Sequence, residues 1–409
     1  MRSALVRPPR AAIVGASLGG LAAAHALTQT GWTVDVYERA AGPLHAKGSG
    51  LGFVHVAAWE ALVQQPMWRR KQRADRSQGS FYYGDLWKFL YQHLPTTTAQ
   101  VHFGQTVSAL EGTPESPVVQ GKDYALVVLA DGGFSKLRKY VLADDPSQDE
   151  GPQPDYAGYV VWRGSIPTSQ LPKHVLQNIK EGVYKSGIYD TIVLKMARDD
   201  GTDHWTLGTF LATPESEIKS YWNQVTEGAS RHDDTICNNN TGNKTNSAVP
   251  CWFASHMRQH FSNVPGLVPL IEHMLAKGEM KPHPQYEFGA TRLVHRGRLV
   301  LLGDAAHMAS PRTAVGAHTA ILDALALREA FIKIPLDETG RNVSISESNN
   351  IDDAVNYYSQ AGLQHARELY QRTREVSSQF VPKAGLEAIV SPEKITQEAC
   401  REAASSTAW

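Results

Sequence analysis

The sequence lacks features that mark several common classes of protein. No uncharged apolar run reaches the roughly 18 residues that a membrane-spanning helix needs, and the first residues lack the apolar core of a secretion signal. The formal net charge is only −1, so no basic surface for nucleic acid or anionic lipid is expected. These absences predict a cytoplasmic protein whose partners include neither nucleic acid nor a membrane.

Cysteine is scarce as well. Cys237, Cys251 and Cys400 have neither the spacing of a zinc site nor that of a redox pair, so no metal site is predicted. A reducing compartment fits this usage, and a bridge between Cys237 and Cys251 stays open as an alternative. The rest of the composition is ordinary for a folded protein, with 42% hydrophobic and 20% charged residues. A chain of 409 residues is too long for one core and predicts about two to three domains.

The first motif lies near the N-terminus. Residues 11–14 form a short apolar run, residues 15–20 are rich in glycine, residues 21–27 favour a helix, and residues 33–37 form a second strand that ends at Glu38. This order of strand, turn, helix, strand and acid is typical of a dinucleotide-binding unit. Within the turn, Gly15 allows a sharp bend, Gly20 allows close packing, and Ser17 replaces the usual second glycine. Because Glu38 repels a 2′-phosphate, the unit favours the adenosine of FAD or NAD.

Two further strands are predicted to end in an acid. Residues 298–302, apolar after Arg298, are followed by Gly303 and Asp304, and then by Pro311 and a helix-forming run at 321–327. Residues 124–130 are also apolar and stop at Asp131. In open α/β sheets, ligands bind at the carboxyl ends of parallel strands. The ends near Gly15, Asp131 and Asp304 are therefore predicted to meet on one extended ligand.

Together these motifs resemble those of the single-component FAD-dependent aromatic hydroxylases, the para-hydroxybenzoate hydroxylase-like superfamily, in order and separation. The resemblance spans about residues 11–380, and residues 156–164, Tyr-Ala-Gly-Tyr-Val-Val-Trp-Arg-Gly, are most similar to the dihydroxypyridine hydroxylase branch. It implies an α/β fold: a Rossmann-like FAD-binding domain, an inserted mixed or antiparallel β-sheet substrate domain, and a C-terminal helix. The implied divisions are 11–83, 101–154 and 285–330 for FAD, 84–100 for a packing helix, 155–284 for substrate, and 352–390 for the helical end.

The resemblance also implies roles for individual residues. Glu38 is expected at the adenosine ribose, Arg39 at the adenine end, Asp131 near the pyrophosphate, Arg138 in the motif tied to NAD(P)H use, and Asp304 at ribitol. The remaining expected FAD contacts are Gly15, Ser17, Leu18, Gly20, Val107, Gly303, Pro311, Ala314, Val315, Gly316 and Ala317.

The sequence departs from the family at several of these positions. Ser17 and Ala314 stand where the family has glycine, Val315 where it has glutamine, and His318 where it has asparagine. Tyr83 stands where an arginine commonly touches the cofactor. These changes leave open how tightly and how rigidly a flavin would be held.

Alternation of apolar and polar residues across 155–284 predicts a sheet with one covered face. In the family such a sheet roofs the substrate cavity. Candidate cavity walls are Tyr184, Tyr189, Trp205, Phe210 and Trp222. A base could be sought among His204, Tyr189, His307 and His318, but a structural role is the simpler interpretation, so no catalytic residue is assigned.

The activity implied is hydroxylation of a small electron-rich aromatic or heteroaromatic ring by molecular oxygen, through a flavin hydroperoxide, with NADPH or NADH as transient reductant and a monomer or homodimer as the active form. Two alternatives remain. One is an FAD-binding dehydrogenase or non-catalytic flavoprotein, which the missing glycines before Gly316 would suit. The other is an NAD-dependent dehydrogenase that uses the first motif alone, which leaves Asp131 and Asp304 unexplained.

Overall fold

A computed structural model describes residues 8–46, 50–68, 78–147, 149–186, 189–216, 251–289, 294–313, 316–333 and 348–378. The chain divides into two compact units. Unit 1 contains the segments up to Asp155 and from Tyr286 to Glu375, and unit 2 contains Tyr156–Gln285 with the described residues from Val376. Unit 2 is thus inserted, in sequence, between two segments of unit 1.

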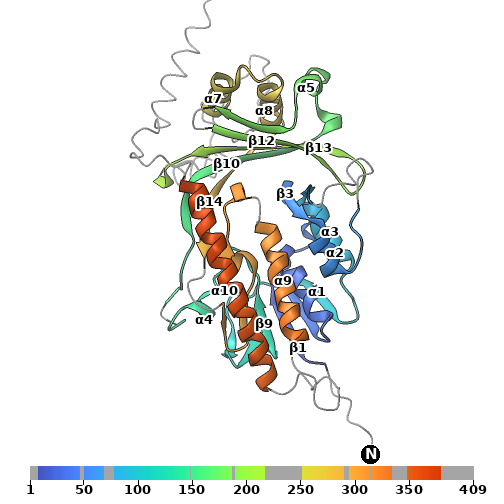
Figure 1. Cartoon of the computed structure of the whole chain (residues 1–409), viewed down its shortest axis with the longest axis vertical. Helices are drawn as coiled ribbons and strands as arrows, with labels where there is room; N and C mark the ends of the chain where they lie inside the picture. The colour runs from blue at the N-terminus through green and yellow to red at the C-terminus, as the bar shows by residue number, and fades with distance from the viewer. Residues whose placement is uncertain are drawn as a thin grey trace, which may run out of the picture. The chain divides into compact units, whose positions relative to one another are not determined.

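Unit 1 is built on a six-stranded sheet in the order β15-β16-β9-β1-β2-β5 (Figure 1). Its strands are β1 (Arg10–Val14), β2 (Thr33–Glu38), β5 (Ala99–Phe103), β9 (Leu126–Leu129), β15 (His295–Arg296) and β16 (Leu299–Leu301). All neighbouring pairs are parallel except β15 with β16. The apolar runs are buried on both faces, as a parallel sheet between helices requires.

Helices and smaller sheets complete unit 1. The helices are α1 (Leu18–Thr28), α2 (Val56–Val63), α3 (Tyr83–Gln92), α4 (Lys139–Leu142), α9 (Gly316–Ile332) and α10 (Ser348–Ser378). The smaller sheets pair β3 (Gly50–His55) with β4 (Gln78–Tyr82), and β6 (Glu111–Thr113) with β7 (Ser116–Val119) and β8 (Lys122–Asp123). α1 lies against α9 (Figure 1), and a Cβ added at Gly19 would lie 3.6 Å from that of Ala320. The small residues of α1 allow this close packing.

Unit 2 is an antiparallel sheet covered on one face by helices. Its strands are β10 (Asp155–Pro167), β11 (Gly182–Ser186), β12 (Tyr189–Ala197), β13 (Asp203–Ala212) and β14 (Lys281–Gly289), in the order β11-β12-β13-β10-β14. The helices are α5 (Lys173–Asn178), α7 (Cys251–Phe261) and α8 (Leu267–Ala276), all on the same side (Figure 1). From Tyr286 onward β14 belongs to unit 1, where Phe288 and Gly289 pair with β17 (His307–Met308).

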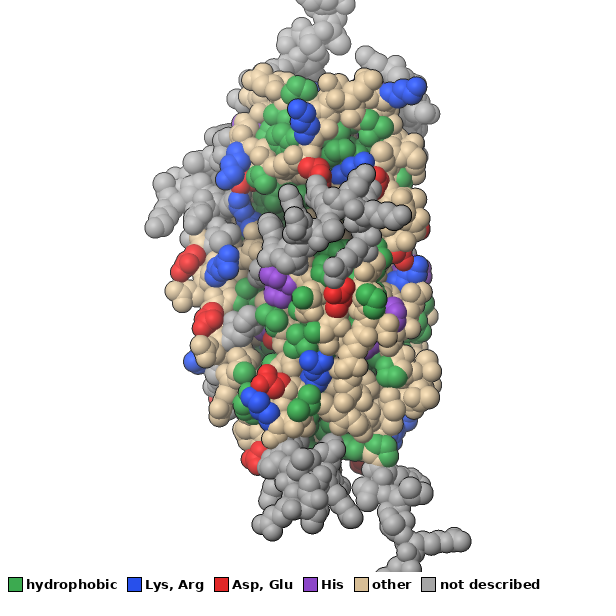
Figure 2. Space-filling model, turned by 45° about the vertical axis from the view of Figure 1, so that its right-hand side comes forward, with side chains coloured by type: hydrophobic (Ala, Val, Ile, Leu, Met, Phe, Trp, Pro, Cys, Tyr) green, Lys and Arg blue, Asp and Glu red, His purple; other side chains and the backbone are tan. Residues whose placement is uncertain are grey.

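The remaining short elements are 3₁₀ turns: η1 (Leu44–Ala46), η2 (Thr168–Gln170), η3 (Gly303–Ala305) and η4 (Pro311–Thr313). On the face drawn in Figure 2, acidic and basic side chains are interspersed. Within the described ranges, every helix is too short or too polar to span a bilayer.

Three segments near the predicted motifs have these bounds. β5 ends at Phe103, and the polar residues that follow it are exposed. After Asp131, the Ser135 hydroxyl accepts the N–H of Arg138, and the four-residue α4 follows. The segment 183–189 is divided between β11 and β12.

Candidate cofactor site

Three predicted strand ends lie side by side. β1 is the neighbour of β9, and β9 is the neighbour of β16. Their last residues are in register, with Val14 opposite Leu129 and Leu129 opposite Leu301. The chain therefore leaves all three strands at one edge of the sheet, the edge at which α/β sheets bind ligands.

The turn after β1 admits only glycine at two positions. Gly15 has φ 100°, and a Cβ there would lie 2.4 Å from the carbonyl oxygen of Ala130. A Cβ at Gly20 would lie 1.8 Å from the carbonyl oxygen of Gly15. The first turn of α1 contains no acid, and the Ser17 hydroxyl does not cap it. The N–H donors and positive dipole end of α1 therefore suit an anion such as pyrophosphate.

The Glu38 carboxylate is held at this turn. It accepts the N–H of Ala16 at 2.9 Å and the N–H of Ala40 at 2.8 Å, and the residue is 7% exposed. Each oxygen keeps a lone pair for a hydroxyl donor. Arg39, the next residue, is exposed.

Tyr83 connects the first motif to the third. Its hydroxyl lies 2.7 Å from that of Ser17, which explains why Ser17 does not cap α1. Burial raises the pKa of Tyr83, the bond to Ser17 opposes this rise, and the carboxylates of Glu38 and Asp304 add to it. Both acids therefore lie within electrostatic reach of one hydroxyl.

The loop that carries Asp304 is fixed by a buried acid of α9. Asp323 accepts the N–H of Gly303 at 2.9 Å, and its carboxylate lies 2.6 Å from Nε2 of His307. Both side chains of this pair are 3% exposed. Burial alone would lower the pKa of His307, but the charge and hydrogen bond of Asp323 raise it above its ordinary value. Below pH 6.5 the pair is therefore a buried ion pair.

Asp304 is exposed to solvent, but nearby protein still desolvates its carboxyl group. The residue is exposed, yet desolvation raises the pKa of its carboxyl against the attraction of His307 and Arg138. Its carboxylate can accept hydroxyl donors from a bound polyol.

Arg138 joins the second strand end to the third. Its guanidinium is fully buried and donates to the carbonyl oxygens of Gly133, Ala305, Pro152 and Asp304 at 2.6 to 3.3 Å. Burial lowers its pKa to about 10, against the attraction of Asp131 and Asp304. Because its donors already serve backbone carbonyls, the arginine positions the two loops. The expected link between Arg138 and NAD(P)H use stays a prediction.

Asp131 keeps one carboxylate oxygen unused. Its Oδ1 is buried and has no hydrogen-bond partner among the described residues. Burial raises the pKa of this carboxyl, and a hydrogen bond from Ser135 opposes the rise. An unsatisfied buried acceptor at a ligand-binding edge points to a missing donor.

The other predicted cofactor residues differ in how deeply they are buried. Leu18 is buried, whereas Val107, Pro311, Gly316 and Ala317 are half-buried. Ala314, Val315 and Trp222 lie outside the described residues, as does the side chain of Tyr189.

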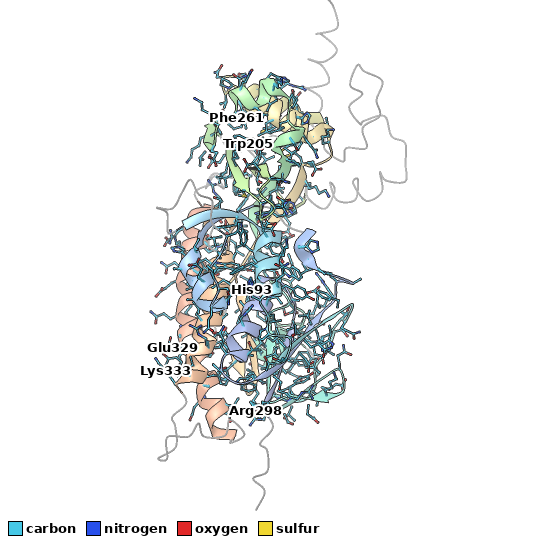
Figure 3. All side chains as sticks on the ribbon, turned by 90° about the vertical axis from the view of Figure 1, so that its right-hand side faces the viewer. His93, Trp205, Phe261, Arg298, Glu329 and Lys333 are labelled. Carbon is cyan, nitrogen blue, oxygen red and sulfur yellow. The ribbon has the colours of Figure 1, made fainter. Side chains whose placement is uncertain are left out.

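The candidate substrate residues are divided between the two faces of the unit 2 sheet. Trp205 packs with Phe261 in the core beneath the helices (Figure 3), and Tyr184 packs against the same core while its hydroxyl donates to the carbonyl of Lys180. Phe210 lies on the opposite face, 6.1 Å from the ring of Tyr159. Only Phe210 of these three therefore lies on the face without helices.

Sequence reasoning missed Asp323 and gave no role to Tyr83. An acid at position 323, inside the apolar helix-forming run, was a usable signal, since such an acid is buried only with a partner. Of the possible bases, His307 is hydrogen-bonded to Asp323 through Nε2. The ring of His318 stacks on that of His55, with 4.2 Å between the ring centroids. His204 is half-buried.

These residues fit FAD. Helix N–H donors suit a pyrophosphate, Glu38 suits a ribose, and the unused oxygen of Asp131 and the accessible Asp304 suit hydroxyl donors. No group of three potential metal ligands occurs within the described ranges.

Comparison with known families gives two matches. Residues 275–344 match the model of an FAD binding domain, and residues 13–48 match that of an NAD(P)-binding Rossmann-like domain. They cover the loop of Asp304 and the turn of Gly15, respectively.

Characterised relatives resemble most of the chain. The 2,6-dihydroxypyridine 3-monooxygenase of Paenarthrobacter nicotinovorans is 27% identical over 79% of this chain and 83% of the relative. The 6-hydroxynicotinate 3-monooxygenase of Pseudomonas fluorescens is 26% identical over 85% of this chain and 88% of the relative.

Solved structures share the fold. The 2,6-dihydroxypyridine-3-hydroxylase of Arthrobacter nicotinovorans matches with a TM-score of 0.64 at 21% identity, over 91% of this chain and 93% of that one. The HpxO protein of Klebsiella pneumoniae, solved with FAD and uric acid, matches with a TM-score of 0.64 at 19% identity, over 96% and 92% of the two chains. These findings confirm the expected α/β, Rossmann-like fold and the resemblance of this chain to the single-component FAD-dependent aromatic hydroxylases.

Proposed function

We propose that this chain is an FAD-dependent, NAD(P)H-using monooxygenase that hydroxylates a small hydroxylated aromatic or N-heteroaromatic ring. The relatives support the class of reaction, because those named above act on dihydroxypyridine and hydroxynicotinate. The observation that carries the proposal in the structure is the alignment of three strand ends, which brings the loops of Gly15, Asp131 and Asp304 to one edge of the sheet. A site for nicotinamide dinucleotide alone would need only the first of these.

The proposed roles follow the geometry of unit 1. Glu38 accepts ribose hydroxyls, the first turn of α1 holds pyrophosphate, and Asp131 and Asp304 accept hydroxyls of the chain that joins pyrophosphate to the flavin ring. Arg39, Val107, Pro311 and residues 314–317 are proposed as further contacts. Tyr83 keeps Ser17 from capping α1 and so preserves the N–H donors for the anion.

Bound FAD would supply the redox chemistry, namely acceptance of a hydride from NADPH or NADH and activation of molecular oxygen. The chain's own part is to bind and orient. Asp323 and Arg138 hold the Asp304 loop from two sides, so that its carboxylate keeps a fixed position. The proposal includes a cytoplasmic enzyme, as the cysteine usage suggests, and a monomer or homodimer as its active form.

The test begins with the purified protein. We expect a yellow protein whose oxygen uptake with NADPH or NADH increases on addition of 2,6-dihydroxypyridine or 6-hydroxynicotinate. Isotopically labelled oxygen gas should place one labelled atom in the product. A yellow protein that never incorporates this label, across a panel of phenols and hydroxypyridines, would be a dehydrogenase or binding flavoprotein instead. A protein that binds no FAD would refute the proposal.

A further inference from the structure

Helix α7 of unit 2 carries two histidines one turn apart. Phe253, Met257 and Phe261 are buried and anchor this helix in the core between the helices and the sheet. His256 and His260 each precede one of these core residues, so both lie at the margin of the buried stripe, and both are half-buried. Packing of the apolar stripe therefore fixes the positions of two imidazoles on a regular helix (Figure 1).

The two imidazole rings are spaced for one bound ion. Side chains at positions i and i+4 of a helix are neighbours, with about 5 to 6 Å between their Cβ atoms. The ring centroids of His256 and His260 are 5.9 Å apart, and the ring planes are inclined by 33°. Nitrogens about 2 Å from a tetrahedral metal ion place two imidazole centroids about 5 Å apart. A small rotation of the two side chains therefore brings both rings to one ion.

Ser186 of β11 orients the second ring. Tyr184, two residues earlier on the same strand, packs against the core beneath the helices, so the alternation of side chains directs Ser186 to the same face. The Ser186 hydroxyl lies 3.4 Å from Nδ1 of His260. When Nδ1–H donates to this hydroxyl, Nε2 carries the lone pair and is the ligand atom. A partner on the second ring nitrogen is the usual arrangement for a metal-binding histidine.

Both imidazoles are held in the neutral form that binds metal ions. Burial lowers the pKa of His256 below its ordinary value, and the charge of His260 lowers it further. Burial also lowers the pKa of His260. A neutral imidazole offers its lone pair to a metal ion without first losing a proton. Arg258, the arginine of α7, pairs with Glu272 of α8, so the positive charge nearest in sequence is balanced.

We propose that His256 and His260 form a binding site for a divalent transition-metal ion. No third histidine, cysteine or acid completes a set of three ligands among the described residues, so water fills the remaining coordination positions. Imidazole nitrogen suits Zn²⁺, Ni²⁺ and Cu²⁺, whereas Mg²⁺ and Ca²⁺ prefer oxygen ligands. Cu²⁺ binds most tightly of these ions at a given set of ligands. The ion joins two turns of α7 and so stabilises unit 2. This site does not depend on the proposed function, because it uses no residue of the cofactor site.

The test counts copper sites by titration calorimetry on the full-length, tag-free protein loaded with FAD. Wild type should bind one equivalent of Cu²⁺ more than His256→Gln. His260→Gln and the double variant should lose the same single equivalent, because the two rings act as one site. Ser186→Ala should keep the site but weaken it about 10-fold, as expected for a partner of a ligand. His174→Gln is the matched control, because His174 is an exposed histidine on α5 of the same unit, and it should lose nothing.

Two further measurements identify the ligands. Electron paramagnetic resonance of the bound Cu²⁺ should show coupling to two imidazole nitrogens in wild type and in His174→Gln. Zn²⁺ should raise the unfolding temperature of wild type and leave that of His256→Gln unchanged, with far-ultraviolet circular dichroism to verify the fold of each variant. An unchanged copper count in His256→Gln would overturn the proposal. Loss of two equivalents in the double variant would overturn it as well, because the histidines would then bind separately.

Discussion

Asp323→Asn tests how the Asp304 loop is held. The wild-type carboxylate accepts the N–H of Gly303 at 2.9 Å and lies 2.6 Å from the imidazole of His307, with both side chains 3% exposed. Asparagine keeps an acceptor for Gly303 but cannot balance a buried imidazolium. Removing one partner of a buried ion pair costs about 3 kcal/mol. For a unit of this size, that loss lowers the unfolding temperature by roughly 6 to 12 °C.

The pH dependence gives a second measurement. The pKa of His307 is raised above its ordinary value of 6.5, so between that value and its folded pKa the folded state holds one more proton than the unfolded state. Its contribution to stability is complete below pH 6.5 and declines as the pH rises through the folded pKa. This decline should be present in wild type and absent in Asp323→Asn.

Thermal unfolding by circular dichroism at several pH values, with FAD at one fixed concentration, checks both statements. Asp353→Asn on α10 is the control, because it removes an exposed carboxylate from a helix of the same unit. If the two variants unfold within about 1 °C of each other and keep the same pH slope, the buried ion pair does not hold this loop.

Three further predictions concern unit 1. Asp304→Asn should raise the dissociation constant of FAD about 10- to 100-fold, measured by flavin fluorescence, and undiminished retention of FAD contradicts its role. Gly20→Ala should abolish FAD binding, because the new Cβ would lie 1.8 Å from a carbonyl oxygen; Gly42→Ala, with open space around its Cβ, should bind normally. Arg138→Met should destabilise the fold by about 3 kcal/mol in chemical unfolding, whereas the same change at the exposed Lys136 should be nearly neutral.

The strand ends of unit 1 could be predicted because their signal is local. A buried strand is an apolar run, and the acid or glycine that stops it is visible in the sequence at Gly15, Asp131 and Asp304. Their order in the sheet was not predicted, since no local pattern states which strands are neighbours.

The contacts that fix the site could not be predicted in the same way. Tyr83 meets Ser17 from 66 positions away, and Arg138 meets Ala305 from 167 positions away, so both contacts depend on the packing of complete elements. Alternation predicted the unit 2 sheet but did not say which face the helices cover. Trp205 and Phe210 therefore seemed equivalent as cavity walls, although they lie on opposite faces.

The interrupted sheet of unit 1 has a consequence for synthesis of the chain on the ribosome. β9 ends at Leu129 and its partner β16 begins at Leu299, so translation must continue for on the order of ten seconds before that edge of the nascent sheet finds its neighbour. During this interval the Arg138 guanidinium lacks two of its carbonyls, those of Asp304 and Ala305. A nascent chain released before Leu299 therefore carries an unpaired apolar strand, the kind of exposed edge that chaperones bind and that aggregates if left uncovered.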